Sequence, residues 1–358
     1  MKAMQIIEWG KPLEPREIEI PHMGERSALV RVLASGVCHT DVHYIGGYYD
    51  LGEGRKLSMA ERGIPLPITP GHEIAGKVER LGAEAKLEQS TVREGDGVVV
   101  FPWIGCGVCR KCRLGFENIC ENKPKTLGIF RDGGYAEYVL VPDIRYLVPL
   151  GEIDPSHGAP LACSGLTTFS AVKKARAATN ELVVILGAGG LGTTAIQIVK
   201  NTIGSKVLVV DVDDAKLKLA QSLGADAVVN SRGLETRDVL TKIKDANGGA
   251  LADAAIDFVG MPATSSLGFD SLGRGGRLVI VGLFGGEGRF PLPLFPLRSR
   301  EIIGNFTGTL QDLAEMVELV RRGLVKPVVS ESYPLNEVNL VLDKLVAGKI
   351  EGRAVVTP

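Results

Sequence analysis

The sequence has almost no net charge and no long uninterrupted hydrophobic segment. Its 358 residues carry 41 basic and 42 acidic side chains, which gives a net charge of −1. A neutral chain lacks the overall attraction that draws proteins to nucleic acid or anionic membranes, so we expect neither as a partner. Charged residues interrupt every long apolar run, and the first eight residues contain no apolar signal core. We therefore expect a soluble protein of the cytoplasm.

Cysteine is also scarce, with six in the chain. Six cysteines can form three disulfides, but disulfide frameworks occur mostly in short secreted chains. This chain is long, and we expect no secretion signal at its start. The positions of the cysteines point instead to metal binding.

Four of the cysteines share one glycine-rich loop with the spacing C-x2-C-x2-C-x7-C: Cys106, Cys109, Cys112 and Cys120. Four thiolates this close in sequence can surround one zinc ion without help from elsewhere. Because thiolates fill all four positions, we expect a structural zinc. An alternative is a zinc-ribbon-like module that binds nucleic acid, since five basic residues lie nearby: Arg110, Lys111, Arg113, Lys123 and Lys125. Glu117 and Glu121 lie in the same stretch and weaken that alternative.

The other two cysteines indicate a second site. Cys38 precedes His39 and Thr40, Cys163 lies in Cys163-Ser164-Gly165, and His72 stands between them in Gly71-His72-Glu73. Two thiols and one imidazole suit a zinc ion whose fourth position stays open for chemistry. Each residue alone has an ordinary alternative, since free cysteines are often buried and a histidine can bond the backbone in a turn.

Neighbouring residues strengthen the case for this open site. Asp41 or Glu73 can hold the second nitrogen of His72 or tune the metal. Thr40 and His43 offer a hydroxyl and an imidazole that can carry a proton to solvent. An open zinc site lowers the pKa of bound water from 15.7 to about 7 and should act similarly on an alcohol. The alkoxide that forms can then transfer hydride to a nicotinamide.

The pattern of the chain changes near residue 182. The first 150 residues hold ten of the 19 prolines and only short apolar runs, which is typical of an irregular β-rich domain. From Leu182 onward, short Val- and Ile-rich strands alternate with helical segments. That alternation predicts βαβ units and a doubly wound parallel sheet. The strand-like tail, Ala354-Val355-Val356, is expected to return to the first domain.

A dinucleotide fingerprint opens the second region. The apolar strand 182–186 runs directly into Gly187-Ala188-Gly189-Gly190-Leu191-Gly192, after which a helix begins. In such a loop the glycines permit a tight turn, close approach of a pyrophosphate, and close packing of helix on strand. The helix N-terminus presents free N–H groups to the phosphates.

Asp211 ends the next strand, 19 residues after Gly192. A carboxylate there can accept hydrogen bonds from both ribose hydroxyls and repel a 2′-phosphate, which predicts NAD rather than NADP. The alternative is that Asp211 merely caps the following helix.

Taken together, these motifs resemble the zinc-dependent medium-chain alcohol dehydrogenases, nearly from end to end. The resemblance implies an α/β protein with a GroES-like, β-rich catalytic domain (residues 1–152 and 299–358, zinc lobe 102–122). The resemblance also implies a Rossmann coenzyme domain (residues 153–298). It also implies two zinc ions per chain, NAD, and a homotetramer or homodimer with a contact near Glu301–Phe306.

The resemblance assigns roles position by position. Cys38, His72 and Cys163 would bind the catalytic zinc, with Glu73 behind it. Thr40 would touch the substrate oxygen and His43 would complete the proton relay. His39, Lys216 and Arg353 match positions that assist coenzyme binding, together with the loop residues Gly187, Gly189, Gly190, Leu191 and Gly192 and the ribose-binding Asp211.

The expected reaction is reversible oxidation of primary or secondary aliphatic or benzylic alcohols to aldehydes or ketones. Five apolar residues fall near segments that line the substrate cleft of the family: Trp103, Phe130, Leu283, Phe284 and Phe306. Core packing is the alternative for each.

A polyol or amino-alcohol dehydrogenase of the sorbitol or threonine type is the alternative enzyme, although that branch has an acid at the position of Cys163. The long loop 46–70 is compatible with a place at the cleft rim or in an oligomer contact.

Overall fold

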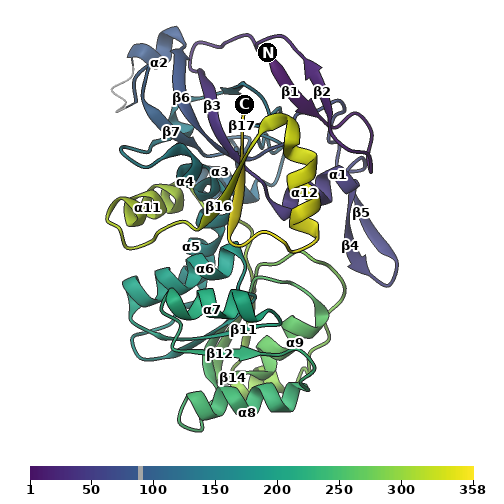
Figure 1. Cartoon of the computed structure of the whole chain (residues 1–358), viewed down its shortest axis with the longest axis vertical. Helices are drawn as coiled ribbons and strands as arrows, with labels where there is room; N and C mark the ends of the chain where they lie inside the picture. Colours follow the sequence, from purple (N-terminus) through teal and green to yellow (C-terminus); the bar gives the residue numbers. More distant parts are fainter. Residues whose placement is uncertain (88–91) are drawn as a thin grey trace.

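The computed structural model describes residues 1–87 and 92–358. Figure 1 shows two parts arranged along the long axis of the molecule. Both chain termini lie in the upper part, whereas the lower part is built from the middle of the sequence. The GroES-like catalytic domain and the Rossmann coenzyme domain that the sequence predicts are therefore both present.

The upper part is organised around a mainly antiparallel sheet of order β16-β17-β3-β6-β7-β9, with β8 paired to β3. The C-terminal strand pairs with β3, where Val355 faces Gly36, so the tail does return to the first domain. Two small hairpins complete the strands of this part. Their bounds are β1 (Lys2–Gln5), β2 (Glu14–Glu17), β3 (Ala28–Gly36), β4 (Tyr48–Gly52), β5 (Arg55–Ser58), β6 (Glu73–Leu81), β7 (Gly97–Val100), β8 (Tyr138–Val141), β9 (Leu147–Pro149), β16 (Val329–Pro334) and β17 (Arg353–Thr357).

The lower part contains a parallel sheet of order β12-β11-β10-β13-β14-β15. Its strands are β10 (Leu182–Leu186), β11 (Lys206–Asp211), β12 (Ala227–Asn230), β13 (Ala252–Asp257), β14 (Leu272–Ile280) and β15 (Glu301–Gly304). This strand order is that of a doubly wound dinucleotide-binding sheet. The predicted fold class is confirmed.

Helices cover both faces of the lower sheet, which explains why its strands are apolar throughout. Val183 and Ile185 of β10 join a core shared with the upper part, whereas Val184 and Leu186 point into a second core on the opposite face. The α-helices are α1 (His39–Gly46), α2 (Ala83–Leu87), α3 (Arg110–Arg113), α4 (Pro155–Gly158), α5 (Ser164–Ala175), α6 (Gly190–Ile198), α7 (Asp214–Ser222), α8 (Thr236–Ala246), α9 (Pro262–Asp270), α10 (Leu294–Arg298), α11 (Leu310–Arg321) and α12 (Val338–Val346). Short 3-10 turns are η1 (Glu117–Ile119), η2 (Ile144–Tyr146), η3 (Ala159–Ala162) and η5 (Leu335–Glu337), and η4 (Val199–Ile203) is a π-helical turn.

One predicted domain boundary is wrong. A division after residue 298 would assign Glu301–Gly304 to the catalytic domain, but β15 pairs with β14 in the parallel sheet. Ile302 faces Leu278 and Ile303 faces Val279 in that pairing. The apolar pattern of this strand fits either sheet, so its partner cannot be read from the sequence.

The loop 46–70 forms the β4–β5 hairpin, at the right of Figure 1. It reaches the coenzyme domain through two exposed ion pairs: Arg55 to Glu287 at 2.8 Å and Arg289 to Glu53 at 3.4 Å. The backbone N–H of Gly286 also donates to the carbonyl of Asp50 at 3.3 Å. The hairpin therefore spans the two domains at the edge of the cleft.

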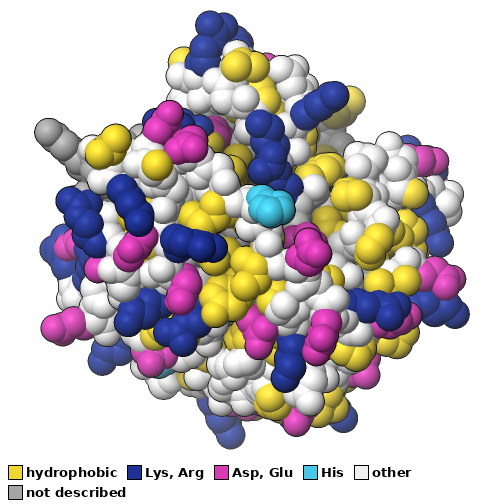
Figure 2. All heavy atoms as spheres, turned by 90° about the horizontal axis from the view of Figure 1, so that it is seen from above, with side chains coloured by type: hydrophobic (Ala, Val, Ile, Leu, Met, Phe, Trp, Pro, Cys, Tyr) yellow, Lys and Arg dark blue, Asp and Glu magenta, His cyan; other side chains and the backbone are white. Residues whose placement is uncertain are grey.

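The end of the molecule seen in Figure 2 carries basic and acidic side chains intermixed with apolar ones. This distribution agrees with the near-zero net charge. The longest α-helices in the described ranges, α5 and α11, have 12 residues each. Within those ranges, no helix combines the length and the apolar character needed to cross a bilayer.

The close contact between β3 and β6 gives a test of the upper sheet. A Cβ atom at Gly76 would lie 2.1 Å from the carbonyl oxygen of Arg31. We expect Gly76→Ala to destabilise the protein by about 1–3 kcal/mol because two backbones must separate. Gly97→Ala on the adjacent β7 is the matched control, since a Cβ there meets nothing within 4 Å. Thermal unfolding of both variants measures the difference, and equal melting temperatures would contradict this packing.

Candidate active site

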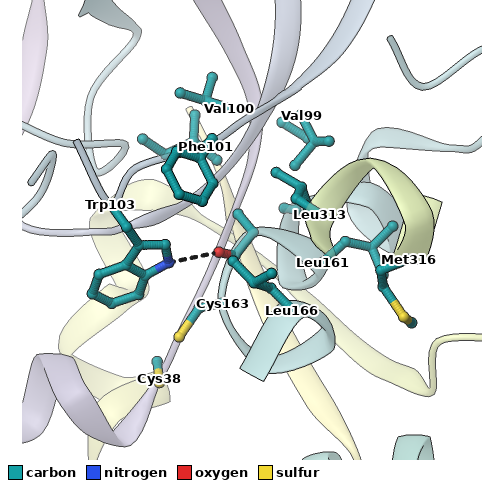
Figure 3. Packing of buried hydrophobic residues seen from close by; sticks show 14 of the residues in the cluster. Cys38, Val99, Val100, Phe101, Trp103, Leu161, Cys163, Leu166, Leu313 and Met316 are labelled. Atoms are coloured by element: carbon teal, nitrogen blue, oxygen red, sulfur yellow. Dashed lines mark hydrogen bonds between the residues drawn. The ribbon is translucent and has the colours of Figure 1, made fainter. Parts of the chain in front are cut away.

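Four ligand-bearing side chains meet where the two domains join. Cys38 ends the loop between β3 and α1, His72 and Glu73 begin β6, and Cys163 precedes α5. Their ligand atoms all lie within 4.8 Å of one another, and all four residues are buried. Gly36 makes this possible, because a Cβ at this residue would lie 1.9 Å from Oε2 of Glu73. Figure 3 shows Cys38 and Cys163 beneath Trp103.

Asp41 holds His72 in one orientation. The Nδ1–H of His72 donates to Oδ1 of Asp41 at 3.1 Å, because a carboxylate can only accept. Oδ2 of Asp41 accepts from the backbone N–H of Cys38 at 3.0 Å and from the hydroxyl of Tyr135 at 2.8 Å. Burial is the largest single effect and opposes protonation of His72, but the charge and hydrogen bond of Asp41 together with those of Cys38 outweigh it and raise the pKa of the imidazole.

The opposite nitrogen of His72 is left free. Its Nε2 is buried and has no hydrogen-bond partner among the described residues. An unpartnered buried nitrogen is costly unless a ligand completes it. A carboxylate on Nδ1 with Nε2 directed at a cluster of thiols is the arrangement that zinc-binding histidines adopt.

The thiols and Glu73 complete the set. The hydrogen bond from Cys163 lowers the pKa of the Cys38 thiol against the effect of burial, and His72 adds to the lowering. Both oxygens of Glu73 are engaged: Oε1 accepts from the N–H of Ser164 at 3.1 Å and Oε2 from Arg353 at 2.6 Å. Cys38, His72 and Cys163 therefore remain as the three available donors, and this donor set fits zinc with an open fourth position.

The four-cysteine lobe is a second candidate metal centre. The sulfurs of Cys106, Cys109, Cys112 and Cys120 also lie within 4.8 Å of one another. Backbone N–H groups of Val108 and Cys109 donate to Cys106 Sγ at 3.5 and 3.3 Å and lower the pKa of that thiol to about 6. Donors aimed at sulfur stabilise thiolate, so the lobe fits zinc in a closed, four-thiolate site.

The first site opens into a cavity between the domains. The predicted residues Thr40, His43, Leu283 and Phe306 line its walls. Trp103 and Phe284 line it too, whereas Phe130 does not. The prediction for Phe130 is therefore wrong: this ring packs at the core, about 5.9 Å from the guanidinium of Arg62.

Trp103 connects the metal cluster to the cavity wall. Its indole N–H donates to the carbonyl of Ala162 at 3.0 Å (Figure 3). The indole ring stands edge-on to His72 and to Phe306, each at 5.4 Å between ring centres. One side chain thus buttresses the histidine and shapes the apolar wall beside it.

The glycine loop joins β10 to α6 as the sequence predicts. Gly187 has φ +94°, which favours glycine, and a Cβ at Gly192 would lie 2.1 Å from the carbonyl oxygen of Gly187. Gly189 faces open space, with nothing within 4 Å of its Cβ position. Leu191 lines the active-site cavity. The loop therefore leaves room for a pyrophosphate at the start of α6.

Asp211 lies at the end of β11, beside this loop. Its Oδ2 accepts from the N–H of Ala188 at 2.7 Å, and Oδ1 accepts from Val212 at 2.7 Å. The cap of α7 is Asp213, whose side chain accepts from the N–H groups of Ala215 and Lys216. The alternative that Asp211 caps this helix is thus excluded.

The three basic residues occupy different surroundings. His39 lines the cavity and lies 5.4 Å from the ring of Phe284, and burial lowers its pKa. Arg353 is buried, donates to the carbonyl of Val37 at 3.0 Å, and packs against Gly190. Lys216 lies on α7, in the first turn after the Asp213 cap.

Comparison with known proteins agrees with both halves of this site. The chain matches the family model for the alcohol dehydrogenase GroES-like domain over residues 24–152 and that for zinc-binding dehydrogenases over residues 190–322. It is 40% identical to an NAD-dependent alcohol dehydrogenase of Sulfurisphaera tokodaii, and the match covers all of both chains. This chain belongs to the zinc-dependent medium-chain alcohol dehydrogenases.

Two solved structures show the range of this family around the chain. The alcohol dehydrogenase of the archaeon Aeropyrum pernix has 35% identity and a TM-score of 0.88, and the match covers 100% of each chain. The D-arabinose dehydrogenase of Sulfolobus solfataricus has 30% identity and a TM-score of 0.82, over 100% of this chain and 99% of the other. The solved structures similar to this chain therefore include enzymes named for different substrates.

Some residues of the site were missed from the sequence. Tyr135 donates to Asp41, and Tyr44 and Asn305 line the cavity. Tyr44 follows His43 on the same helix, which was a usable signal. Tyr135 gave none, because it lies 94 positions from Asp41 in the sequence and only the fold brings the two side chains together.

The two metal centres predict opposite effects of cysteine removal. We expect Cys112→Ala to lose the lobe zinc and lower the melting temperature, because this closed site stabilises the fold. Cys163→Ala should lose the other zinc with a smaller change in melting temperature. Zinc per chain and thermal unfolding of both variants measure this, and full zinc content in Cys163→Ala would show that Cys163 is not a ligand.

Proposed function

We propose that this chain catalyses the reversible, NAD-dependent oxidation of primary and secondary aliphatic or benzylic alcohols to aldehydes or ketones. The observation that carries the proposal is the cavity that joins Cys38 and Cys163 to Leu191 of the glycine loop. Trp103 and Phe306 contact each other in one apolar wall of this cavity, and polar side chains such as Thr40 and His43 line another part of it. Such a cavity accepts an apolar alcohol between the metal centre and the coenzyme.

Two bound groups supply the chemistry that side chains lack. Cys38, His72 and Cys163 would hold a zinc ion that, when bound, would acidify a hydroxyl group, and a bound NAD would accept the hydride. Trp103, Leu283 and Phe306 line the cavity and place apolar surface beside the position of the substrate. The buried Asp41 keeps the proton on Nδ1 of His72, so that Nε2 stays available.

The chain also provides a route for the proton. Thr40 and His43 lie three residues apart on α1, so their side chains project from one face of the helix. Both line the cavity. Burial lowers the pKa of His43, which leaves the imidazole neutral near pH 7 and able to accept a proton. The proposed path runs from the substrate hydroxyl to Thr40 and through His43 to solvent.

Coenzyme binding is assigned to the glycine loop and its neighbours. Gly187, Gly189, Gly190, Leu191 and Gly192 surround the pyrophosphate position, and Asp211 accepts from the ribose hydroxyls. His39, Lys216 and Arg353 supply basic groups around the phosphates. Oδ1 of Asp211 already accepts from the N–H groups of Val212 and Asp213, whereas Oδ2 accepts only from Ala188 and keeps a free lone pair for a ribose hydroxyl, because each carboxylate oxygen offers two.

The proposal also covers the domain bounds, the oligomeric state and the cellular compartment of the protein. We assign the catalytic domain to residues 1–152 and 305–358 and the coenzyme domain to 153–304, so that β15 stays with its sheet. The dehydrogenase is a homotetramer or homodimer that uses β15, which ends the order of its sheet. All six cysteines are free, and all of them belong to the two candidate metal centres, which supports the cytoplasm as the compartment of the protein.

A sugar or polyol dehydrogenase is the second candidate. The similarity to the D-arabinose dehydrogenase favours it, and the apolar cavity walls oppose it. A polyol would leave several hydroxyl groups without partners against Trp103 and Phe306.

A substrate panel distinguishes these candidates. We expect kcat/KM with NAD to be at least about tenfold higher for 1-butanol and benzyl alcohol than for sorbitol, threonine and D-arabinose, as apolar pockets discriminate by such factors. The measurement is NADH formation by the zinc-loaded enzyme, followed by the absorbance of the reduced nicotinamide at ~340 nm. Higher kcat/KM for the polyols or for D-arabinose would reverse the assignment.

Coenzyme choice tests the role of Asp211 separately. Asp211→Gly should lower kcat/KM for NAD by about tenfold or more, since a hydrogen bond to a charged group contributes about 1.5–3 kcal/mol. It should also reduce the discrimination against NADP. Asp213→Gly is the control, because it removes the α7 cap and leaves the carboxylate of Asp211 in place. An unchanged NAD preference in Asp211→Gly would refute this role.

A further inference from the structure

A second cavity adjoins the active-site cavity on the side of the β4–β5 hairpin. We call it the outer chamber. It lies between this hairpin and two coenzyme-domain segments, residues 260–265 and 280–290. The two cavities share wall residues: Tyr44, Tyr49, Gly282, Leu283 and Phe306. A substrate whose hydroxyl lies at Cys38 and Cys163 can therefore extend past Phe306 into the outer chamber.

Arg62 is the one basic residue among the described residues that line the outer chamber. It is half-buried. Its Nη1 donates to the hydroxyl of Tyr44 at 3.2 Å and lies 3.5 Å from the sulfur of Met59. The guanidinium is about 5.9 Å from the ring centres of both Tyr44 and Phe130.

No carboxylate lies within ion-pair distance of Arg62 in the part of the chain that is described. The contrast with the nearby rim is clear, where Arg55 pairs with Glu287 and Arg289 pairs with Glu53. The single acidic residue in the chamber wall is Asp50, which is exposed and whose Oδ1 accepts from the N–H of Gly52 at 2.8 Å. The positive charge of Arg62 is thus uncompensated inside an otherwise largely apolar chamber.

The geometry of the guanidinium suits a carboxylate. Arginine has five N–H donors in a rigid plane, and the contacts with Tyr44 and Met59 both use Nη1. Contact with aromatic rings fixes the plane without using the remaining N–H groups. A preorganised fork with free donors binds a carboxylate in a bidentate manner, and partial burial strengthens the pairing.

We propose that Arg62 binds a carboxylate at the far end of the substrate, so that the enzyme prefers ω-hydroxy acids and the corresponding aldehyde acids over uncharged alcohols of equal length. The proposal rests on the proposed function, because it names the substrate class of the same site. The alkyl chain lies along Leu283 and Phe306, the hydroxyl lies at the metal centre, and the carboxylate lies in the outer chamber. Arg62 is then a specificity-determining residue.

The test compares matched substrates that differ only in the terminal charge. The substrates are 4-hydroxybutanoate with 1-butanol and 6-hydroxyhexanoate with 1-hexanol, each assayed with NAD and the zinc-loaded enzyme. The measured quantity is the ratio of kcat/KM for the hydroxy acid to kcat/KM for the alcohol. In the wild-type enzyme this ratio should exceed one for at least one chain length.

We expect Arg62→Gln to lower this ratio by about tenfold to a hundredfold, mainly through KM, because it removes a hydrogen-bonded ion pair with the substrate. Arg62→Met tests the same loss while it retains an apolar stem against Tyr44 and Phe130. Arg55→Gln is the matched control, since Arg55 pairs with Glu287 at the exposed rim, and its ratio should equal that of the wild type.

Two results have separate meanings. If the wild type oxidises 1-hexanol but the ratio stays below one at both lengths, or is equal in all the Arg62 variants, the carboxylate site is disproved and the proposed function stands. If the zinc-loaded wild type oxidises neither class, the proposed function itself fails and the inference falls with it.

Discussion

A buried ion pair between Glu73 and Arg353 holds the active site together. The two residues lie 280 positions apart, on β6 and β17, and their side chains meet at 2.6 Å. Glu73 also accepts from the N–H of Ser164 and thereby positions the segment that carries Cys163. Arg353 donates to the carbonyl of Val37, next to Cys38, and packs against Gly190 of the coenzyme loop. Removal of either partner would leave a buried charge uncompensated, which costs about 3–5 kcal/mol.

The two candidate zinc centres differ in how their ligands are arranged along the chain. The four-cysteine lobe takes all its ligands from one short loop, so it forms locally and braces a segment that has little apolar core of its own. The centre of Cys38, His72 and Cys163 draws on three distant segments and exists only in the folded protein. Its residues are buried, but the cavity leaves one side of the cluster open. Closed coordination stabilises structure, whereas an open position admits substrate.

Much of this architecture could be predicted because its signals are local in sequence. The cysteine spacing and the strand–glycine–helix pattern each specify geometry within about 30 residues or fewer. Asp41 was named as a possible partner of His72, and the structure supports that pairing at 3.1 Å. The sequence left Glu73 as an equal candidate for this role, and only the fold shows that Glu73 is engaged by Ser164 and Arg353.

The walls of the cavity were harder to predict, because they depend on tertiary packing. Phe130 and Phe306 are both large aromatic residues in loops, but Phe306 lines the cavity and Phe130 does not. The pairing of β15 depends on the same long-range packing, and so does the contact of Tyr135 with Asp41. In each case the residue type allows several partners, and only the assembled domains select one.

The central claim is that the chain holds two zinc ions in chemically different sites. Crystals of the protein purified without added metal, measured above and below the zinc absorption edge, test it most directly. The account predicts two anomalous peaks per chain, one among the four lobe sulfurs and one between Cys38 Sγ, His72 Nε2 and Cys163 Sγ. A peak at the lobe alone, persisting after zinc is added back, would contradict the assignment of the second site.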